Sequence, residues 1–314
     1  MRLNLTDTTT SAVRTELMRS SQRLGGLTTG VVLNLIIMTD ESDQYDAVQA
    51  ASQASREHPC RVLGVIARYG RTAPRLDAEI ILGEDGPGQM VLLRLHGELT
   101  EHAESVVAPL LVPDTAVVIW WPGKSPQAPA ADPLGALAQR RITDAATSAT
   151  PRQALRELAA GYQPGDTDLS WTRTTTWRSL LAATLDRPFG VISSAVVSAE
   201  PDNPSAELMA AWLADRLAVP VQRQVSAGPG ITGVSFVTGA GEIAISRTDG
   251  RNATLSRPGE PDRQVALHRR DLAELLAEEL RRLDPDEVYA AALTALATAG
   301  DAAETGQAAE TGQV

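Results

Sequence analysis

Short apolar runs alternate with helix-like segments along the chain, and this alternation predicts an α/β protein. Residues 31–40 form an apolar, β-branched run that ends in polar turn residues, as a buried strand does. Residues 42–59 follow as an alanine-rich helix that Pro59 stops, and residues 60–69 return as a strand. These three segments predict a β-α-β unit with a right-handed crossover.

The rest of the first half continues the same mixture. Residues 75–99 contain two strand-like runs separated by a glycine-rich turn, and residues 100–111 read as a helix with Thr100 as its N-cap. A last strand is expected at 115–121, followed by a proline-rich loop. The pattern of residues 133–162 then predicts a largely helical segment.

A second β-α-β unit is expected after residue 190. Residues 190–198 and 219–225 read as strands, and residues 203–218 read as the helix between them. Asn203 suits the N-cap of this helix and Pro204 its first helical position, because proline needs no hydrogen-bond partner there.

The chain then predicts short antiparallel strands over residues 233–258 and two closing helices. Asp284, Pro285 and Glu287 fit an N-cap, a first-turn proline and a capping-box acid for the last helix. The helix before it has leucines that recur on one face, namely Leu272, Leu275, Leu276, Leu280 and Leu283.

The predicted fold class is therefore α/β, with two domains that each hold a mixed β-sheet, a β-α-β unit and packed helices. A chain of 314 residues is long for one core, which favours two domains. We expect an N-terminal domain over residues 1–166, a C-terminal domain over residues 167–300 with closing helices, and a disordered tail over residues 301–314. The tail repeats itself and is poor in large apolar residues.

Charge and composition exclude several classes of function. The net charge of -11 argues against nucleic-acid binding, which depends on a basic face. The longest apolar run, Val31–Met38, is far shorter than the roughly 20 residues that span a bilayer. A single cysteine, Cys60, cannot form an intrachain disulfide, and the N-terminus lacks the apolar run of a secretory signal. We expect a soluble cytoplasmic protein without nucleic-acid or membrane partners.

Two motifs resemble nucleotide-binding loops without their structural context. Gly228–Gly233 has the letters of the dinucleotide fingerprint, but a strand-like run follows where a helix is needed, and Pro229 lacks an N–H donor. Gly123–Ser125 has the end of a phosphate-binding loop and the only lysine, but Val118 stands where that loop needs glycine. The histidines and the cysteine lack metal-ligand spacing. We therefore predict no catalytic, cofactor or metal site.

Residues 170–181, "SWTRTTTWRSLL", place two tryptophans close to two arginines. Tryptophan and arginine dominate binding hot spots, so this stretch is a candidate partner surface. The competing interpretation buries the tryptophans between the two domains and pairs the arginines with Asp144, Asp166 or Asp168. The candidate partner-binding residues are Arg140, Arg141, Trp171, Arg173, Thr174, Trp177 and Arg178.

Six blocks occur in a distinctive order: "RLGGLTTGVVLNLIIMTD", "HPCRVL", "PDTAVVIWWPG", "RRITDA", "DLSWTRTTTWRSLLA" and "GEPDRQVALHRR". In this order the chain resembles the actinobacterial glucose-6-phosphate dehydrogenase assembly proteins, the OpcA family, from about residue 20 to residue 297. The resemblance implies a two-domain, non-catalytic partner that assembles or activates glucose-6-phosphate dehydrogenase and so supports NADPH supply. Thiol control in cyanobacterial relatives does not carry over, because Cys60 has no second cysteine.

Three functions remain open at this point. The first is an assembly factor or allosteric activator of glucose-6-phosphate dehydrogenase, for which Trp177→Ala and Arg178→Ala should weaken binding and leave the monomer folded. The second is a regulatory module whose arginines bind a sugar phosphate or nucleotide. The third is a sugar-phosphate enzyme with carboxylate acid–base chemistry.

Overall fold

The computed structural model describes residues 1–23, 31–70, 72–82, 89–247 and 249–298. The chain divides into two units. The first unit consists of Met1–Thr147, Gly165–Thr167 and Asp271–Pro285, and the second of Ser148–Pro164, Asp168–Arg270 and the chain from Asp286 onward. The predicted turn at 83–88 and the predicted tail at 301–314 lie outside the described residues. The domain limits at residues 166 and 300 stay predictions.

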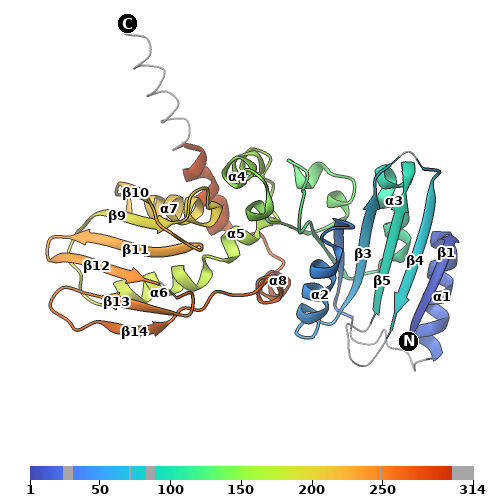
Figure 1. Cartoon of the computed structure of the whole chain (residues 1–314), viewed down its shortest axis with the longest axis horizontal. Helices are drawn as coiled ribbons and strands as arrows, with labels where there is room; N and C mark the ends of the chain where they lie inside the picture. The colour runs from blue at the N-terminus through green and yellow to red at the C-terminus, as the bar shows by residue number, and fades with distance from the viewer. Residues whose placement is uncertain (24–30, 71, 83–88, 248, 299–314) are drawn as a thin grey trace, which may run out of the picture. The chain divides into compact units, whose positions relative to one another are not determined.

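An eight-stranded mixed sheet forms the frame of the first unit (Figure 1). Five neighbouring strands are parallel. At one edge β4 runs antiparallel to them, and β1 runs antiparallel to β4. The order across the sheet is β1 (Arg2–Thr8), β4 (Arg75–Ile81), β5 (Gln89–His96), β3 (Cys60–Arg68), β2 (Leu33–Asp40), β6 (Ala116–Trp120), β7 (Arg140–Thr143) and β8 (Asp166–Asp168).

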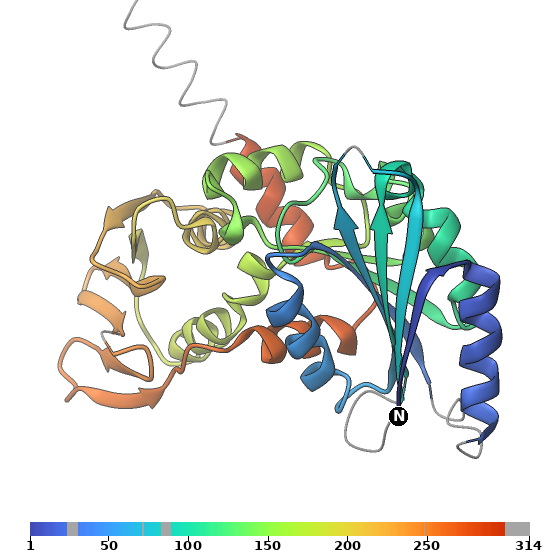
Figure 2. The same cartoon turned by 45° about the vertical axis from the view of Figure 1, so that its right-hand side comes forward.

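Helices cover both faces of this sheet (Figure 2). On one face, α1 (Thr10–Arg23) and α3 (Ala103–Val107) bury Val13, Leu17 and Val107 against strand residues. On the other face, α2 (Gln44–Ala54) packs on β2 and β3 through its alanines, and α8 (Leu272–Arg281) packs on α2. The parallel pair β2 and β3, joined through α2, confirms the first predicted β-α-β unit.

The second unit holds a six-stranded mixed sheet. Its order is β10 (Val221–Val225), β9 (Ile192–Ala199), β11 (Ile231–Thr238), β12 (Gly241–Ser246), β13 (Asn252–Ser256) and β14 (Arg263–Ala266). The strands β9 and β10 are parallel and joined through α7 (Pro204–Leu217), whereas the remaining pairs are antiparallel. This confirms the second β-α-β unit and the meander, and Asn203 caps α7 by accepting from the Ala206 N–H at 2.9 Å.

Four further helices belong to the second unit: α4 (Pro151–Ala160), α5 (Leu169–Thr172), α6 (Thr175–Leu185) and a last helix at residues 287–298. Short 3-10 helices join the elements of the first unit: η1 (Gly97–His102), η2 (Ala108–Leu110), η3 (Pro129–Ala131), η4 (Gly135–Leu137) and η5 (Ala145–Thr147).

The prediction of a largely helical segment over residues 133–162 is wrong for its first half. That part forms η4, strand β7 and η5, and only Pro151–Ala160 is α-helical. The four residues of β7 are extended because their backbone groups pair with β6, from Val118–Arg140 to Trp120–Ile142. A pairing partner that is distant in sequence overrides the local preference of so short a segment.

Two predicted helix caps are also wrong, and several elements were not predicted. Thr100 lies inside η1, where its hydroxyl donates to the Gly97 carbonyl at 2.8 Å. Asp286, rather than Asp284, caps the last helix by accepting from the N–H groups of Val288 and Tyr289 at 2.9 and 3.0 Å. The helices and strands that the sequence pattern missed include β1, α1, β8, α5 and β14.

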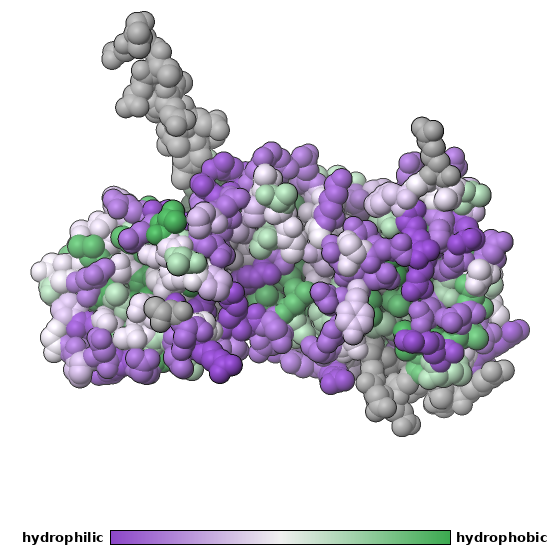
Figure 3. All heavy atoms as spheres, viewed as in Figure 1, coloured by the Kyte–Doolittle hydropathy of each residue, from purple (hydrophilic) through white to green (hydrophobic). Residues whose placement is uncertain are grey.

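No helix among the described residues is long and apolar enough to cross a membrane. Figure 3 shows hydrophilic residues over most of the visible face, with apolar residues in smaller patches.

Candidate functional site

Trp171 is the centre of a polar cluster in the second unit. Its side chain is only 1% exposed, and its indole N–H donates to Asp286 Oδ2 at 2.8 Å. The guanidinium carbon of Arg178 lies 3.7 Å from the centre of the indole ring, and the Tyr289 ring centre lies 5.6 Å from it. A cation over an aromatic face and a buried hydrogen bond therefore fix this side chain together.

The threonines next to Trp171 position the cluster. The Thr174 hydroxyl donates to the Trp171 carbonyl at 2.6 Å and accepts from Arg178 Nε at 3.0 Å. Asp168 begins the turn by accepting from the Ser170 N–H at 2.8 Å, as an N-cap does. Thr174 is fully buried, so its contacts are structural in this unit.

Trp177 belongs to the apolar core of the second unit. It is 1% exposed and lies in one buried cluster with Leu181, Met209 and Phe236. Truncating so large a buried side chain leaves a cavity, and a folding control must therefore accompany Trp177→Ala. Arg173 and Arg178 are partly exposed, whereas both tryptophan rings are buried. A partner-binding role for this stretch stays a prediction.

Arg140 and Arg141 lie on β7, in the first unit. Arg140 forms an ion pair with Glu279 and also donates to the Asp284 carbonyl at 3.1 Å. Arg141 pairs with Asp166, as the interpretation that buried these arginines predicted. All four side chains of these pairs are buried. The guanidinium groups are thus engaged inside the protein rather than presented to a soluble phosphate.

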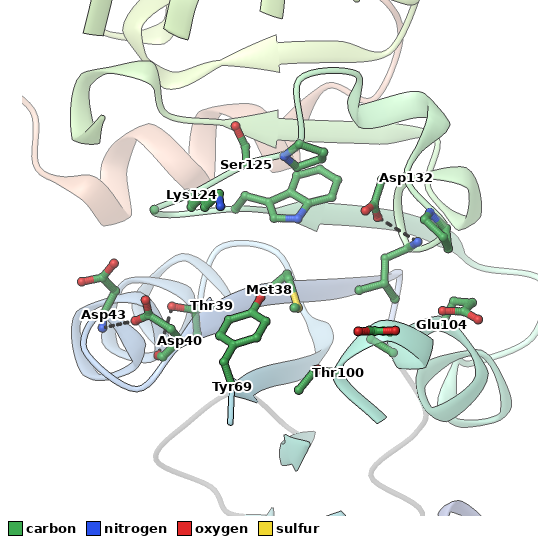
Figure 4. Close-up of a pocket in the computed structure, with 17 residues that line it drawn as sticks. Met38, Thr39, Asp40, Asp43, Tyr69, Thr100, Glu104, Lys124, Ser125 and Asp132 are labelled. Atoms are coloured by element: carbon green, nitrogen blue, oxygen red, sulfur yellow. Dashed lines mark hydrogen bonds between the residues drawn. The ribbon is translucent and has the colours of Figure 1, made fainter. Parts of the chain in front are cut away.

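A cavity of about 280 Å³ lies outside the carboxyl ends of the parallel strands in the first unit (Figure 4). In the sheet, β2 and β6 are neighbours. The strand that follows β2 in sequence, β3, lies on the far side of β2, and the strand that follows β6, β7, lies on the far side of β6. The direction in which the chain builds the sheet therefore reverses between β2 and β6. Open α/β sheets bind ligands at this switch point. The sequence predicted the strands but not this cavity.

Asp40 ends β2 and lines this cavity in the turn that leads into α2. Its Oδ1 accepts from the N–H groups of Ser42 and Asp43 at 2.9 and 3.2 Å and from the Ser42 hydroxyl at 2.6 Å. The bond from the Ser42 hydroxyl is the main cause that lowers the pKa of Asp40, with the two backbone bonds adding to it against a modest desolvation. A protein carboxylate therefore accepts from the N–H groups of the turn just before α2, the region where helix N-termini bind anions.

The cavity wall is strongly acidic. Five carboxylates and one lysine line it: Asp40, Asp43, Glu101, Glu104, Asp132 and Lys124. None of these six side chains forms an ion pair with another residue in the part of the chain that the structure describes. Figure 4 shows Asp40 and Asp43 toward one end and Glu104 and Asp132 toward the other, with the Tyr69 ring between them.

The loop after β6 completes the cavity. Trp121 lines it while being only 2% exposed, and no described residue accepts a hydrogen bond from its indole N–H. At Gly123, a Cβ atom would lie 2.7 Å from Asp43 Oδ2, so the absence of a side chain lets the two loops approach closely. Gly123–Ser125, which the sequence predicted to be a loop, thus faces Asp43 across the cavity.

No group of three His, Cys, Asp or Glu side chains within the described ranges is arranged to hold a metal ion. Residues 228–230 lie in the turn between β10 and β11, as predicted, and residues 231–233 already form the start of β11.

Two family models match the chain in sequence. One, described as the N-terminal domain of a glucose-6-phosphate dehydrogenase subunit, matches residues 51–160, and the other, described as the C-terminal domain of that subunit, matches residues 164–293. The chain belongs to the OpcA family of glucose-6-phosphate dehydrogenase subunits. The resemblance of the six sequence blocks to this family is therefore confirmed. No curated protein matches the chain.

Solved structures of several oxidoreductases are similar to this OpcA-family chain at low identity. The 3-ketoreductase KijD10 from Actinomadura kijaniata, in complex with NADP and TDP-benzene, is 11% identical with a TM-score of 0.47, covering 85% of this chain and 95% of its own. A dehydrogenase (MviM) from Clostridium difficile is 6% identical with a TM-score of 0.45, covering 86% and 99%. An oxidoreductase from Sinorhizobium meliloti is 11% identical with a TM-score of 0.40, covering 87% and 89%. Likenesses this distant carry no argument about function.

Proposed function

We propose that the chain is a non-catalytic assembly factor and activator of glucose-6-phosphate dehydrogenase, which promotes the active oligomer of that enzyme and so the supply of NADPH. The observation that carries this proposal is the match of both parts of the chain to the two domains of a glucose-6-phosphate dehydrogenase subunit. We place its action in the cytoplasm.

The loop around Asp40 supports the non-catalytic part of the proposal. A dehydrogenase of this general architecture would receive the cofactor pyrophosphate on free N–H groups at the start of the helix after β2. Here the Asp40 carboxylate accepts from the N–H groups of Ser42 and Asp43 in the turn that leads into that helix, and Asp43 adds a second negative charge beside it. A pyrophosphate would have to displace one carboxylate and approach another.

Partner contacts through Arg140, Arg141, Trp171, Arg173, Thr174, Trp177 and Arg178 remain part of the proposal. Arg173 and Arg178 are the members with exposed surface in the second unit, and they are the ones that a rigid partner can reach. Among the buried members, Trp171 and Thr174 act on such a contact by holding Arg178 in place.

The test is a titration of a matched glucose-6-phosphate dehydrogenase with this chain, in which turnover and complex mass are followed together. We expect saturable activation and a discrete complex at the same stoichiometry. Activation that follows a change in the dehydrogenase oligomer indicates assembly, because a binder of one oligomer favours it by mass action. Activation at constant oligomer mass indicates an allosteric effect. If no complex forms and no activation occurs under reducing conditions, the proposal is wrong.

A further inference from the structure

The acidic cavity at the switch point of the first unit contains none of the residues proposed to contact the dehydrogenase. We infer that it binds a basic side chain, an arginine or lysine, carried on a segment of the partner dehydrogenase. This inference rests on the proposed function for the identity of the partner. The chemistry of the cavity supports the charge of the ligand independently.

The first argument is charge. Five carboxylates and one ammonium group surround a cavity of about 280 Å³, and none has an ionic partner among the described residues. Like charges held close together repel one another, and a cation between them relieves that repulsion. The Asp40 and Asp132 carboxylates also accept bonds from backbone N–H groups, which hold them in place. A phosphate or another anion is disfavoured at such a wall.

The second argument is an unused donor at the base of the cavity. Trp121 is almost fully buried, lines the cavity, and donates its indole N–H to no described residue. The Trp121 indole nitrogen is not one of the fully buried atoms that lack a partner, so it keeps contact with the solvent of the cavity and is free to donate to a bound group in place of water. A peptide segment carries both features at once, because its carbonyl accepts from the indole and its basic side chain reaches the carboxylates.

The third argument is the shape of the cavity. Its volume lies just below the roughly 300–1,000 Å³ of pockets that hold drug-sized ligands, which suits one long side chain better than a dinucleotide. Tyr69, at 76% exposed, lies between the two groups of carboxylates and offers an aromatic face for a cation (Figure 4). Lys124, at the rim, is exposed and is the only basic group of the lining.

The first arm of the test needs no dehydrogenase. The probe is arginine blocked as its N-acetyl N-methylamide, with the citrulline analogue as the uncharged control, titrated into the full chain. We expect the arginine probe, and not the citrulline one, to shift the NMR resonance of the Trp121 indole N–H. The resonance is assigned with Trp121→Phe, which keeps a ring at that position. An arginine probe that shifts nothing overturns the inference.

The second arm measures binding to the dehydrogenase. The double variant Glu104→Gln, Asp43→Asn removes two cavity charges and leaves Asp40 intact. Its matched control, Asp186→Asn, Glu242→Gln, removes two exposed charges of the second unit that have no ion pair within the described ranges. We expect the cavity variant to bind about fivefold more weakly or worse, with a reduced salt dependence, and the control to bind as the wild type does.

The two arms separate the possible failures. If the cavity variant binds the dehydrogenase as tightly as its control, the dehydrogenase does not supply the basic side chain and the inference is overturned. If the wild-type chain does not bind the dehydrogenase at all, the proposed function fails, and the arginine probe still decides the chemistry of the cavity.

Discussion

The guanidinium carbon of Arg178 lies 3.7 Å from the centre of the Trp171 indole, while the edge of that indole donates to Asp286 at 2.8 Å. One aromatic side chain thereby links a cation on α6 to an anion at the start of the last helix. Asp286 also accepts from the Val288 and Tyr289 N–H groups. The residues that the sequence marked as a binding surface thus join three helices of one unit.

Ionisation of the Asp286 carboxyl group is expected to contribute to the way the free energy of unfolding changes with pH in acid. Burial alone raises its pKa, but the bonds from Trp171 and Tyr289 and the nearby Arg178 outweigh burial, so its pKa is lowered. An Asp with a lowered folded pKa stabilises the fold above its unfolded pKa, near 3.9, and loses that contribution as the pH falls through the folded value. Asp286→Asn should therefore cost about 1–3 kcal/mol in the free energy of unfolding at pH 7. The deficit should shrink in denaturant titrations near pH 3, and an equal deficit at both pH values would contradict this account.

The buried pair of Arg140 and Glu279 gives a second prediction. Removing one member leaves the other charge buried without its partner, so Glu279→Gln should destabilise the chain by about 3–5 kcal/mol. The double variant Arg140→Met, Glu279→Leu replaces both charges with apolar side chains and should recover most of that loss. Urea unfolding of the three proteins measures the difference. A double variant as unstable as Glu279→Gln would show that the pair itself supplies the stability.

Two glycines near the cavity should respond differently to alanine. A Cβ atom at Gly135 would lie 1.8 Å from the Pro129 carbonyl oxygen, which is backbone and cannot turn away. Gly135→Ala should therefore cost about 1–3 kcal/mol and displace the loop that carries Asp132. At Gly123 the obstacle is the mobile end of the Asp43 side chain, so Gly123→Ala should change stability by less than about 0.5 kcal/mol. Thermal unfolding of the matched pair tests this, and equal losses would refute the backbone clash.

Cys60 is expected to be chemically inert in the folded chain. It is 1% exposed, and burial raises the pKa of its thiol to about 12, so almost no thiolate exists near pH 8. Alkylation by iodoacetamide should be at least about 100-fold slower in buffer than in urea, because the thiolate is the reacting species. Mass spectrometry of the modified chain measures both rates. Similar rates in the two conditions would mean that β3 opens readily.

Nicotinamide dinucleotides are expected not to stabilise the chain, because the carboxylates of Asp40 and Asp43 stand before α2, where a pyrophosphate would meet two negative charges. The unfolding temperature with 1 mM NADP⁺ or NADPH, a concentration on the order of 100 times a Kd of about 10 μM, would otherwise rise measurably. A clear rise would restore the interpretation of the chain as a metabolite-binding module.

Local signals in the sequence determined a large part of the secondary structure. The run that becomes β2 is apolar over its whole length because both faces of a central parallel strand are buried, and such a run is recognisable without a structure. Asn203 and Pro204 fixed the start of α7 because capping involves only neighbouring residues. The two β-α-β units followed from segments of this kind.

Tertiary structure decided the elements whose partners lie far away in sequence. The strand β7 is extended because β6 offers it an edge, and the last helix begins at Asp286, whose other oxygen accepts from Trp171, 115 residues earlier. Tryptophan content could not separate an exposed anchor from a buried core residue, because both uses exploit the same large apolar surface.

The acidic cavity combines residues that the sequence places after strands with a neighbourhood that only the tertiary structure creates. The sequence alone determined that Asp40, Asp43 and Lys124 follow strands, since each stands after an apolar run. Only the order of the strands across the sheet brings the β2 and β6 loops together, and that order comes from hydrogen bonds between segments about 80 residues apart. Local propensity acts over a few residues, whereas the pairing of strands is a property of the whole sheet.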